Sequence, residues 1–345
     1  MLNLTLLAFL ACSGSDNTKQ ESEATKTETP AKEEAKADTA KAEQLQKQAS
    51  AILGPLPEKM PGSENDTPEK IALGKKLYFE KALSINDSQS CNSCHDLNNG
   101  NMGVDHEKTS PGAKGERGGR NSPTSVNAGF HIAQFWDGRA PDLKAQAKGP
   151  ILNPGEMAMP DEETVMKKLS GIPEYPKMFK GAFPDQDKVM TYDNLAEAIA
   201  AFERTLISKD RFDTFQKGDL AALNEQELRG LETFVSTGCI SCHNGATVGG
   251  TSYQKVGVVK PYYTDENTDI GRAAITGNDA EKFFFKVPSL RNIAKTGPYF
   301  HDGEVPTLEE AVSIMAEVQL GKDLKKNEVA DIVAFLNTMN GEITF

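Results

Sequence analysis

The chain has 345 residues, 38% of them hydrophobic and 26% charged, which is enough apolar material for two compact domains. Its formal net charge at pH 7 is −12. Binding the phosphates of a nucleic acid requires a basic face, so this acidic composition argues against nucleic acid as a ligand. A partner protein is instead expected to dock through a basic or largely apolar patch of its own.

The first twelve residues resemble an export signal. Residues 2–11 are apolar but too short to span a bilayer as a helix. They end in a small residue before Cys12, as in a bacterial lipoprotein processing site in which Cys12 is lipidated. Because no Lys or Arg precedes the apolar core and Phe9-Leu10-Ala11 is an imperfect lipobox, cleaved soluble export and a misread start stay open as alternatives. All three place the mature protein outside the cytoplasm.

Residues 13–50 are rich in Lys, Glu, Ala, Thr and Gln and contain almost no large apolar side chains. Such a segment cannot bury enough surface to fold alone. We therefore expect a disordered, flexible tether here, with transient helix near its end, and a globular part that follows it.

Two pairs of cysteines share the spacing C-x-x-C-H, in Cys91-Asn92-Ser93-Cys94-His95 and in Cys239-Ile240-Ser241-Cys242-His243. This spacing predicts covalent attachment of a c-type haem, in which each thiol adds to a vinyl group and the histidine binds the iron. Disulfides and zinc sites are the alternatives. A disulfide framework does not require the histidines, and two of only five histidines stand in these motifs. We therefore expect two haems, with His95 and His243 as axial ligands.

A predicted helix precedes each motif. Thr67-Pro68-Glu69 indicates the start of one helix, and Asn224-Glu225-Gln226-Glu227 caps the other. The repetition indicates an internal duplication and two cytochrome c-like domains, an N-terminal domain at 51–210 and a C-terminal domain at 211–345. Whether the C-terminal tail packs back on the first domain is left open.

Further helices are expected along the stripe Leu195, Ile199, Phe202 and Leu206, at 307–320 with Thr307 as the cap, and at about 327–338. Glycine-rich loops are expected at 98–120 and 244–278, and no convincing series of strands is present. The predicted fold class is mainly α, with long irregular loops.

Several longer motifs follow one another along the chain: Arg120-Asn121-Ser122-Pro123-Thr124, Gln134-Phe135-Trp136-Asp137-Gly138-Arg139, Gly149-Pro150-Ile151, Asn153-Pro154-Gly155-Glu156-Met157, Val287-Pro288-Ser289-Leu290-Arg291-Asn292 and Pro298-Tyr299-Phe300-His301-Asp302-Gly303. With the haem motifs, they make residues 66–340 similar to the bacterial dihaem cytochrome c peroxidases. The resemblance implies that hydrogen peroxide is reduced to water at the N-terminal haem. It also implies that the C-terminal haem receives electrons from a small redox protein, such as a c-type cytochrome or a blue-copper protein.

The same resemblance implies roles for single residues. Met315 would be the second axial ligand of the C-terminal haem and would raise its reduction potential, or it is a core residue of its helix. Glu156 would move a proton between the two peroxide oxygens, as general base and then general acid, and Gln146 would orient the peroxide. Exposure at the surface is the alternative for both residues, because their neighbourhoods in the sequence are polar.

Trp136, the only tryptophan, lies in the motif that the family places between its haems. Electron transfer and rigid packing would each explain it. By the same resemblance, Asn121 and the carbonyl groups of Thr296 and Pro298 would bind a calcium ion at the domain junction. Asn121 is alternatively a turn residue before Pro123.

One position departs from the family pattern. Many members carry a histidine eight residues before the position of Asn121, and this histidine binds the peroxide-site iron in the oxidised state. Here that residue is Ala113. An open site follows unless the loop brings in His106, while Lys114 would first have to lose a proton and His131 is expected to pack structurally.

The resemblance further implies a homodimer, and with the export signal it predicts a periplasmic protein that is lipid-anchored through Cys12. Two rival functions remain. A non-catalytic dihaem electron-transfer cytochrome would need neither Glu156 nor Gln146. A dihaem oxidase that modifies a partner protein would resemble the quinone-cofactor maturation enzymes, which have tyrosine at the position of Met315.

Overall fold

Helices make up nearly all of the regular structure in residues 30–263 and 268–345, which the computed structural model describes. The α-helices are α1 (Pro30–Ile52), α2 (Pro68–Tyr78), α3 (Cys91–Cys94), α4 (Leu143–Leu152), α5 (Glu162–Ser170), α6 (Glu174–Ala182), α7 (Tyr192–Glu203), α8 (Arg211–Gln216), α9 (Glu225–Thr237), α10 (Ala273–Thr276), α11 (Leu308–Leu320) and α12 (Lys326–Asn337). Two strands, β1 (Tyr253–Lys255) and β2 (Phe284–Lys286), pair antiparallel. The predicted fold class is therefore confirmed as mainly α. The predicted export segment with Cys12 lies outside the described residues.

The predicted helix starts are confirmed by their caps. The Thr67 side chain accepts a hydrogen bond from the Lys70 backbone N–H at the start of α2. At the start of α9, Asn224 and Glu227 form a reciprocal capping box, each accepting a bond from the other's backbone N–H. The Thr307 side chain likewise accepts from the Glu310 N–H at the start of α11. These bonds satisfy backbone donors that have no partner inside the helix.

The same helix crossing occurs twice. In the first half α2 packs against α7, and in the second half α9 packs against α12. A Cβ atom on Gly74 of α2 would lie 1.8 Å from the carbonyl oxygen of Ala198, and one on Gly230 of α9 would lie 1.8 Å from that of Asp331. Each crossing is therefore possible only because a glycine lets the two backbones touch. The repeated crossing supports the internal duplication that the sequence predicts.

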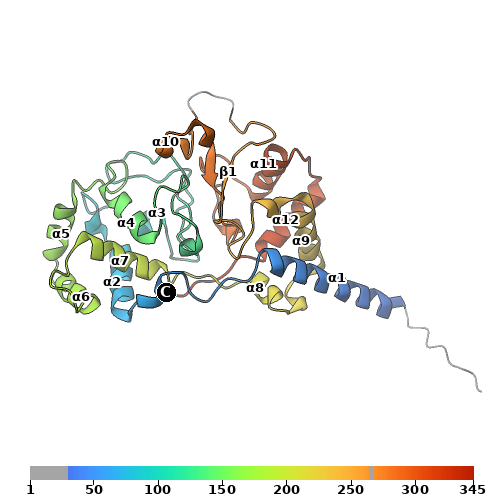
Figure 1. Ribbon diagram of the computed structural model, residues 1–345, viewed down its shortest axis with the longest axis horizontal. Coiled ribbons are helices and arrows are strands. Elements are labelled where there is room, and N and C mark those ends of the chain that lie inside the picture. The colour runs from blue at the N-terminus through green and yellow to red at the C-terminus, as the bar shows by residue number, and fades with distance from the viewer. Residues whose placement is uncertain (1–29, 264–267) are drawn as a thin grey trace, which may run out of the picture. The chain divides into compact units, whose positions relative to one another are not determined.

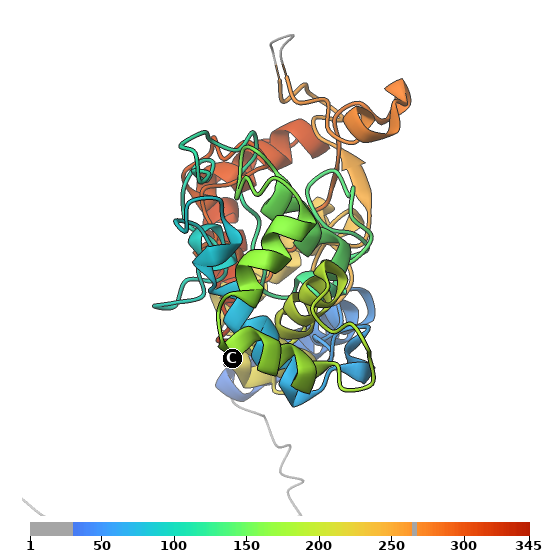
Figure 2. The ribbon, with the colours of Figure 1, turned by 90° about the vertical axis from the view of Figure 1, so that its left-hand side faces the viewer.

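Each half has its own hydrophobic cluster. The first cluster lies among α2 and α4 to α7, and its fully buried members include Leu77, Phe179 and Leu195. The second lies among α8, α9, α11 and α12, around Phe212 and Phe335. Figure 1 shows the two groups of helices, and Figure 2 views the first group in front of the second.

Two segments near opposite ends of the described chain each pack against the half that is farther away in the sequence. Leu45, Ala49 and Leu53 lie four residues apart and are buried in the second cluster, although they precede the first half in sequence. At the other end Phe345 stacks on Phe79 and packs edge-on against Phe202 in the first half, with ring centroids 6.2 and 6.0 Å apart.

The sequence predicts a flexible tether at 13–50 with transient helix near its end, whereas α1 is a continuous helix from Pro30 to Ile52. The overall polarity of the segment hid two apolar residues of this helix, Leu45 and Ala49, which lie four residues apart on one face and are buried in the second cluster. No helix in the described part of the chain is both long and apolar enough to cross a membrane.

The glycine crossings predict a specific destabilisation. Gly74→Ala and Gly230→Ala should each lower the free energy of unfolding by about 1–3 kcal/mol, because the added methyl group overpacks a backbone contact. Gly181→Ala is the matched control, since Gly181 lies in α6 and an added Cβ meets nothing within 4 Å. Thermal denaturation should show lower midpoints for the first two variants only. An unchanged midpoint for Gly74→Ala would contradict the crossing.

Candidate functional site

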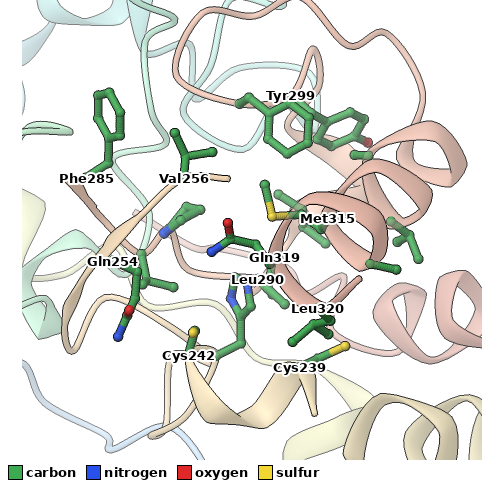
Figure 3. Close-up of a pocket in the computed structure, with 18 of the residues that line it drawn as sticks. Cys239, Cys242, Gln254, Val256, Phe285, Leu290, Tyr299, Met315, Gln319 and Leu320 are labelled. Atoms are coloured by element: carbon green, nitrogen blue, oxygen red, sulfur yellow. The ribbon is translucent and has the colours of Figure 1, made fainter. Parts of the chain in front are cut away.

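A cavity lies in the second half of the chain, and we call it the C-terminal cavity. Cys239, Cys242 and His243 line one side, and Met315 of α11 projects into it opposite Cys242 (Figure 3). The remaining lining is largely apolar and includes Phe234, Leu290, Ile293, Phe300, Leu308, Val312, Leu320, Leu324, Ile332 and Leu336. This largely apolar lining suits a large apolar group.

Local structure places the second motif at the cavity wall. Gly238 ends α9 in the left-handed conformation, with φ of 102°, so the chain turns directly into Cys239. The His243 Nδ1 lies 3.3 Å from the carbonyl oxygen of Val248. Burial lowers the pKa of His243 to about 4, so the ring is neutral. A neutral imidazole that donates through Nδ1 keeps Nε2 as a ligand atom for a metal.

A second cavity lies in the first half, and we call it the N-terminal cavity. Cys91 and Cys94 of α3 line it together with His95. Burial lowers the pKa of His95. Its Nδ1 atom is also buried and has no hydrogen-bond partner among the described residues. The imidazole is therefore neutral and suited to bind a metal.

The chemistry of both walls fits a covalently attached haem. All four motif cysteines are free thiols, so the disulfide alternative finds no support. No group of three or more His, Cys, Asp or Glu side chains in the described ranges is arranged to hold a metal ion, as a zinc site would require. Burial raises the pKa of Cys94 and of Cys239 to about 11, which indicates apolar surroundings for these sulfur atoms.

Glu156 and Gln146 both line the N-terminal cavity, with Gln146 on α4 and Glu156 shortly after that helix. Both side chains are half-buried. The Asn153 amide donates a 2.8 Å hydrogen bond to the Glu156 carboxylate. Burial raises the pKa of Glu156, and the nearby Arg139 and the bond from Asn153 partly offset this shift. The structure therefore brings these two residues to the same cavity as His95.

The loop that carries Ala113 packs against the segment of Glu156. The Ala113 N–H donates to the Glu156 carbonyl at 2.6 Å, and the Asn86 amide donates to the Ala113 carbonyl at 2.7 Å. A Cβ on Gly112 would lie 2.1 Å from the Gly155 carbonyl oxygen, so this contact requires glycine. Ala113 is buried but does not line the cavity.

His106 lies away from the N-terminal cavity wall. Its Nδ1 is 3.0 Å from the Gly297 carbonyl oxygen, and its Nε2 is 3.2 Å from the Asn101 side-chain oxygen. Both ring nitrogens are therefore engaged by other partners. His131 is held in the interior by a hydrogen bond with Lys286.

Trp136 lies where the cavities meet, because it lines both of them and also a smaller third cavity, which we call the junction cavity. Its indole N–H donates to the Asn121 carbonyl at 2.9 Å, and its own carbonyl accepts from the Lys286 N–H at 2.7 Å. Its ring packs edge-on against His301, with centroids 6.1 Å apart. These contacts fix the indole rigidly between the two halves.

The junction cavity brings together the three residues expected to bind calcium. Asn121, Thr296 and Pro298 all line it. The Asn121 amide nitrogen donates to the Glu107 carbonyl at 3.0 Å, which leaves the side-chain oxygen available as a ligand for a hard cation.

Sequence reasoning missed a further carboxyl group, that of Glu203. It is 7% exposed, lines the N-terminal cavity, and one of its oxygens has no hydrogen-bond partner among the described residues. Burial raises its pKa to about 8. A signal was present, because Glu203 follows Ile199 by four residues and so lies on the apolar stripe of α7.

Comparison with known proteins agrees with this geometry. Residues 68–221 match the family model described as di-haem cytochrome c peroxidase. The cytochrome c551 peroxidase of Nitrosomonas europaea is 49% identical over 280 residues, which cover 80% of this chain and 82% of that protein. The cytochrome c551 peroxidase of Pseudomonas aeruginosa is 44% identical over 308 residues, with 88% of each chain covered.

Among solved structures, a MauG-like protein associated with microbial copper homeostasis has a TM-score of 0.74 and 28% sequence identity, and covers 82% of this chain and 93% of its own. The fold and its two motif-lined cavities are thus those of a c-type haem protein. The chain belongs to the di-haem cytochrome c peroxidase family, which implies two haems.

The surroundings of Glu156 predict a measurable electrostatic effect. Arg139→Gln should raise the pKa of Glu156 further, because the cation that offsets its burial is removed. Infrared titration of the carboxyl band, assigned through Glu156→Gln, would report this shift. Arg117→Gln is the control, since that exposed arginine pairs with Glu107 instead. Equal titration in the wild type and Arg139→Gln would contradict the assigned influence of Arg139.

Proposed function

We propose that this protein is a periplasmic dihaem peroxidase that reduces hydrogen peroxide to two water molecules, using two electrons and two protons. A small redox protein, such as a c-type cytochrome or a blue-copper protein, supplies the electrons one at a time. The observation that carries this proposal is the N-terminal cavity, where a haem-attachment motif lies with Glu156 and Gln146.

Side chains on both cavity walls would hold the haems. Cys91 and Cys94 would bind one haem covalently, with His95 as a ligand of its iron. Cys239 and Cys242 would bind the other, with His243 and Met315 as ligands of its iron. When bound, the haems supply one iron that cleaves peroxide and another that accepts donor electrons. The apolar side chains that line the C-terminal cavity would exclude water from the haem bound there.

Glu156 performs the acid–base step. Its carboxylate takes a proton from one peroxide oxygen and returns it to the other, which leaves as water. The raised pKa of Glu156 makes its carboxylate a stronger base in the first half of this step, when it takes the proton. The bond from Asn153 fixes the carboxylate, and the Gln146 amide orients the peroxide by hydrogen bonding.

Four finer proposals accompany this function. A calcium ion at Asn121, Thr296 and Pro298 is supported by their shared cavity. A homodimer and a lipid anchor at Cys12 rest on the resemblance and on the export signal. The division into haem domains at 51–210 and 211–345 is supported by the repeated helix crossing and the two hydrophobic clusters.

Removal of the acid–base group tests the function directly. Glu156→Ala should lower peroxide turnover about 10²–10⁴-fold, the usual contribution of a positioned general acid–base group. The measurement is anaerobic peroxide consumption with a reduced c-type cytochrome. Glu116→Ala is the matched control, because Glu116 is an exposed glutamate of the neighbouring loop.

A pyridine haemochrome assay should give two haems per chain in the wild type and both variants. If the wild-type protein consumes no peroxide, the proposed peroxidase activity is contradicted. An electron-transfer cytochrome is then the favoured function. If Glu156→Ala keeps its activity within about threefold of the wild type, Glu156 is not the acid–base group, because a loss that small lies far below the expected range.

The alanine at position 113 predicts how the oxidised protein reacts. Alanine has no ligand atom, and both ring nitrogens of His106 are engaged elsewhere. The peroxide-site iron should therefore be open opposite His95. Electron paramagnetic resonance of the fully oxidised protein should show a high-spin ferric signal, and peroxide should react without prior reduction.

The variant His106→Ala should leave both properties unchanged. Two low-spin haems that become active only after half-reduction would contradict the open site. If His106→Ala then abolished that behaviour, His106 would be the substitute ligand.

A further inference from the structure

Lys286 of β2 is a buried cation without a carboxylate partner. Its side chain is only 7% exposed, and no ion pair to it occurs within the described ranges. The single hydrogen bond of its ammonium group joins Nζ to Nδ1 of His131 at 3.1 Å. Burying an ammonium group is costly unless an anion compensates its charge.

His131 cannot supply that compensation. Burial and the neighbouring Lys286 lower the pKa of His131, so its ring is neutral and accepts from Lys286 through Nδ1. The proton of the ring is then on Nε2, which is buried and has no partner among the described residues. Gly250 lies against the ring, where a Cβ would come within 2.3 Å of Cδ2, and keeps it in place. The Nε2–H group of His131 and the other N–H groups of the Lys286 ammonium thus have no acceptor among the described residues.

Both residues line the junction cavity, and Lys286 lines the C-terminal cavity as well. A ligand for this pair must be anionic and must be reachable from the C-terminal cavity. A haem attached to Cys239 and Cys242 carries two propionate groups, which are carboxylates of this kind.

We propose that Lys286, supported by His131, binds an ionised propionate of the haem in the C-terminal cavity. This inference rests on the proposed function, because it requires the second haem. The cation then compensates the propionate charge, and its field favours the reduced iron, which has one positive charge fewer. Lys286 is thus a positioning residue that raises the reduction potential of the electron-accepting haem.

Spectroelectrochemistry of three variants tests the proposal. Lys286→Met should shift the midpoint potential of the C-terminal haem to a more negative value, or should add an infrared carbonyl band of a protonated propionate to the redox difference spectrum. Lys286→Arg keeps the positive charge and should restore the wild-type potential and spectrum. Lys326→Met removes the same charge from an exposed position at the start of α12, where solvent screens it, and should change the potential little.

The haem count separates this inference from the proposed function. A wild-type count below two haems per chain would overturn both. Two haems, with a Lys286→Met protein identical to the wild type in potential and infrared spectrum, would overturn the role of Lys286 alone. An equal shift in Lys326→Met, or no restoration by Lys286→Arg, would also overturn it, because the effect would then not come from a charge at this position.

Discussion

Two glycines determine how the main helices of each half pack, because each allows the backbone of one helix to contact the backbone of another helix. Gly74 brings α2 against α7, and Gly230 brings α9 against α12. α2 and α9 each lead into a C-x-x-C-H motif, so the crossing fixes the direction from which the chain reaches each cavity. Both motifs therefore follow a helix whose position a glycine contact holds.

Local sequence signals predicted the elements well. The caps at Thr67, Asn224 and Thr307 each depend on residues at most three positions apart, and the two motifs are equally local. Glu156 and Gln146 were reached through resemblance, and the structure brings both to the cavity of His95. Short-range order and family motifs were therefore enough to name most of the candidate site.

Contacts between distant segments could not be predicted in this way. Lys286 and His131 are 155 positions apart, and neither residue stands out in its own segment. The sequence predicts only transient helix at α1 because the average composition there is polar, whereas the packing of this helix depends on Leu45 and Ala49 on one face. The cavity-facing Glu203 was overlooked for the opposite reason, since its apolar neighbours mark α7 as core.

The crosswise packing of the two ends has a consequence for the chain as a whole. Leu45 and Ala49 belong to the first part of the sequence but complete the core of the second half, while Phe345 belongs to the last part and covers the first. Each half is thus completed by residues from the other end of the sequence, so the two halves are not two separate, consecutive segments of the chain. A cut at residue 210 would therefore expose apolar surface on both halves.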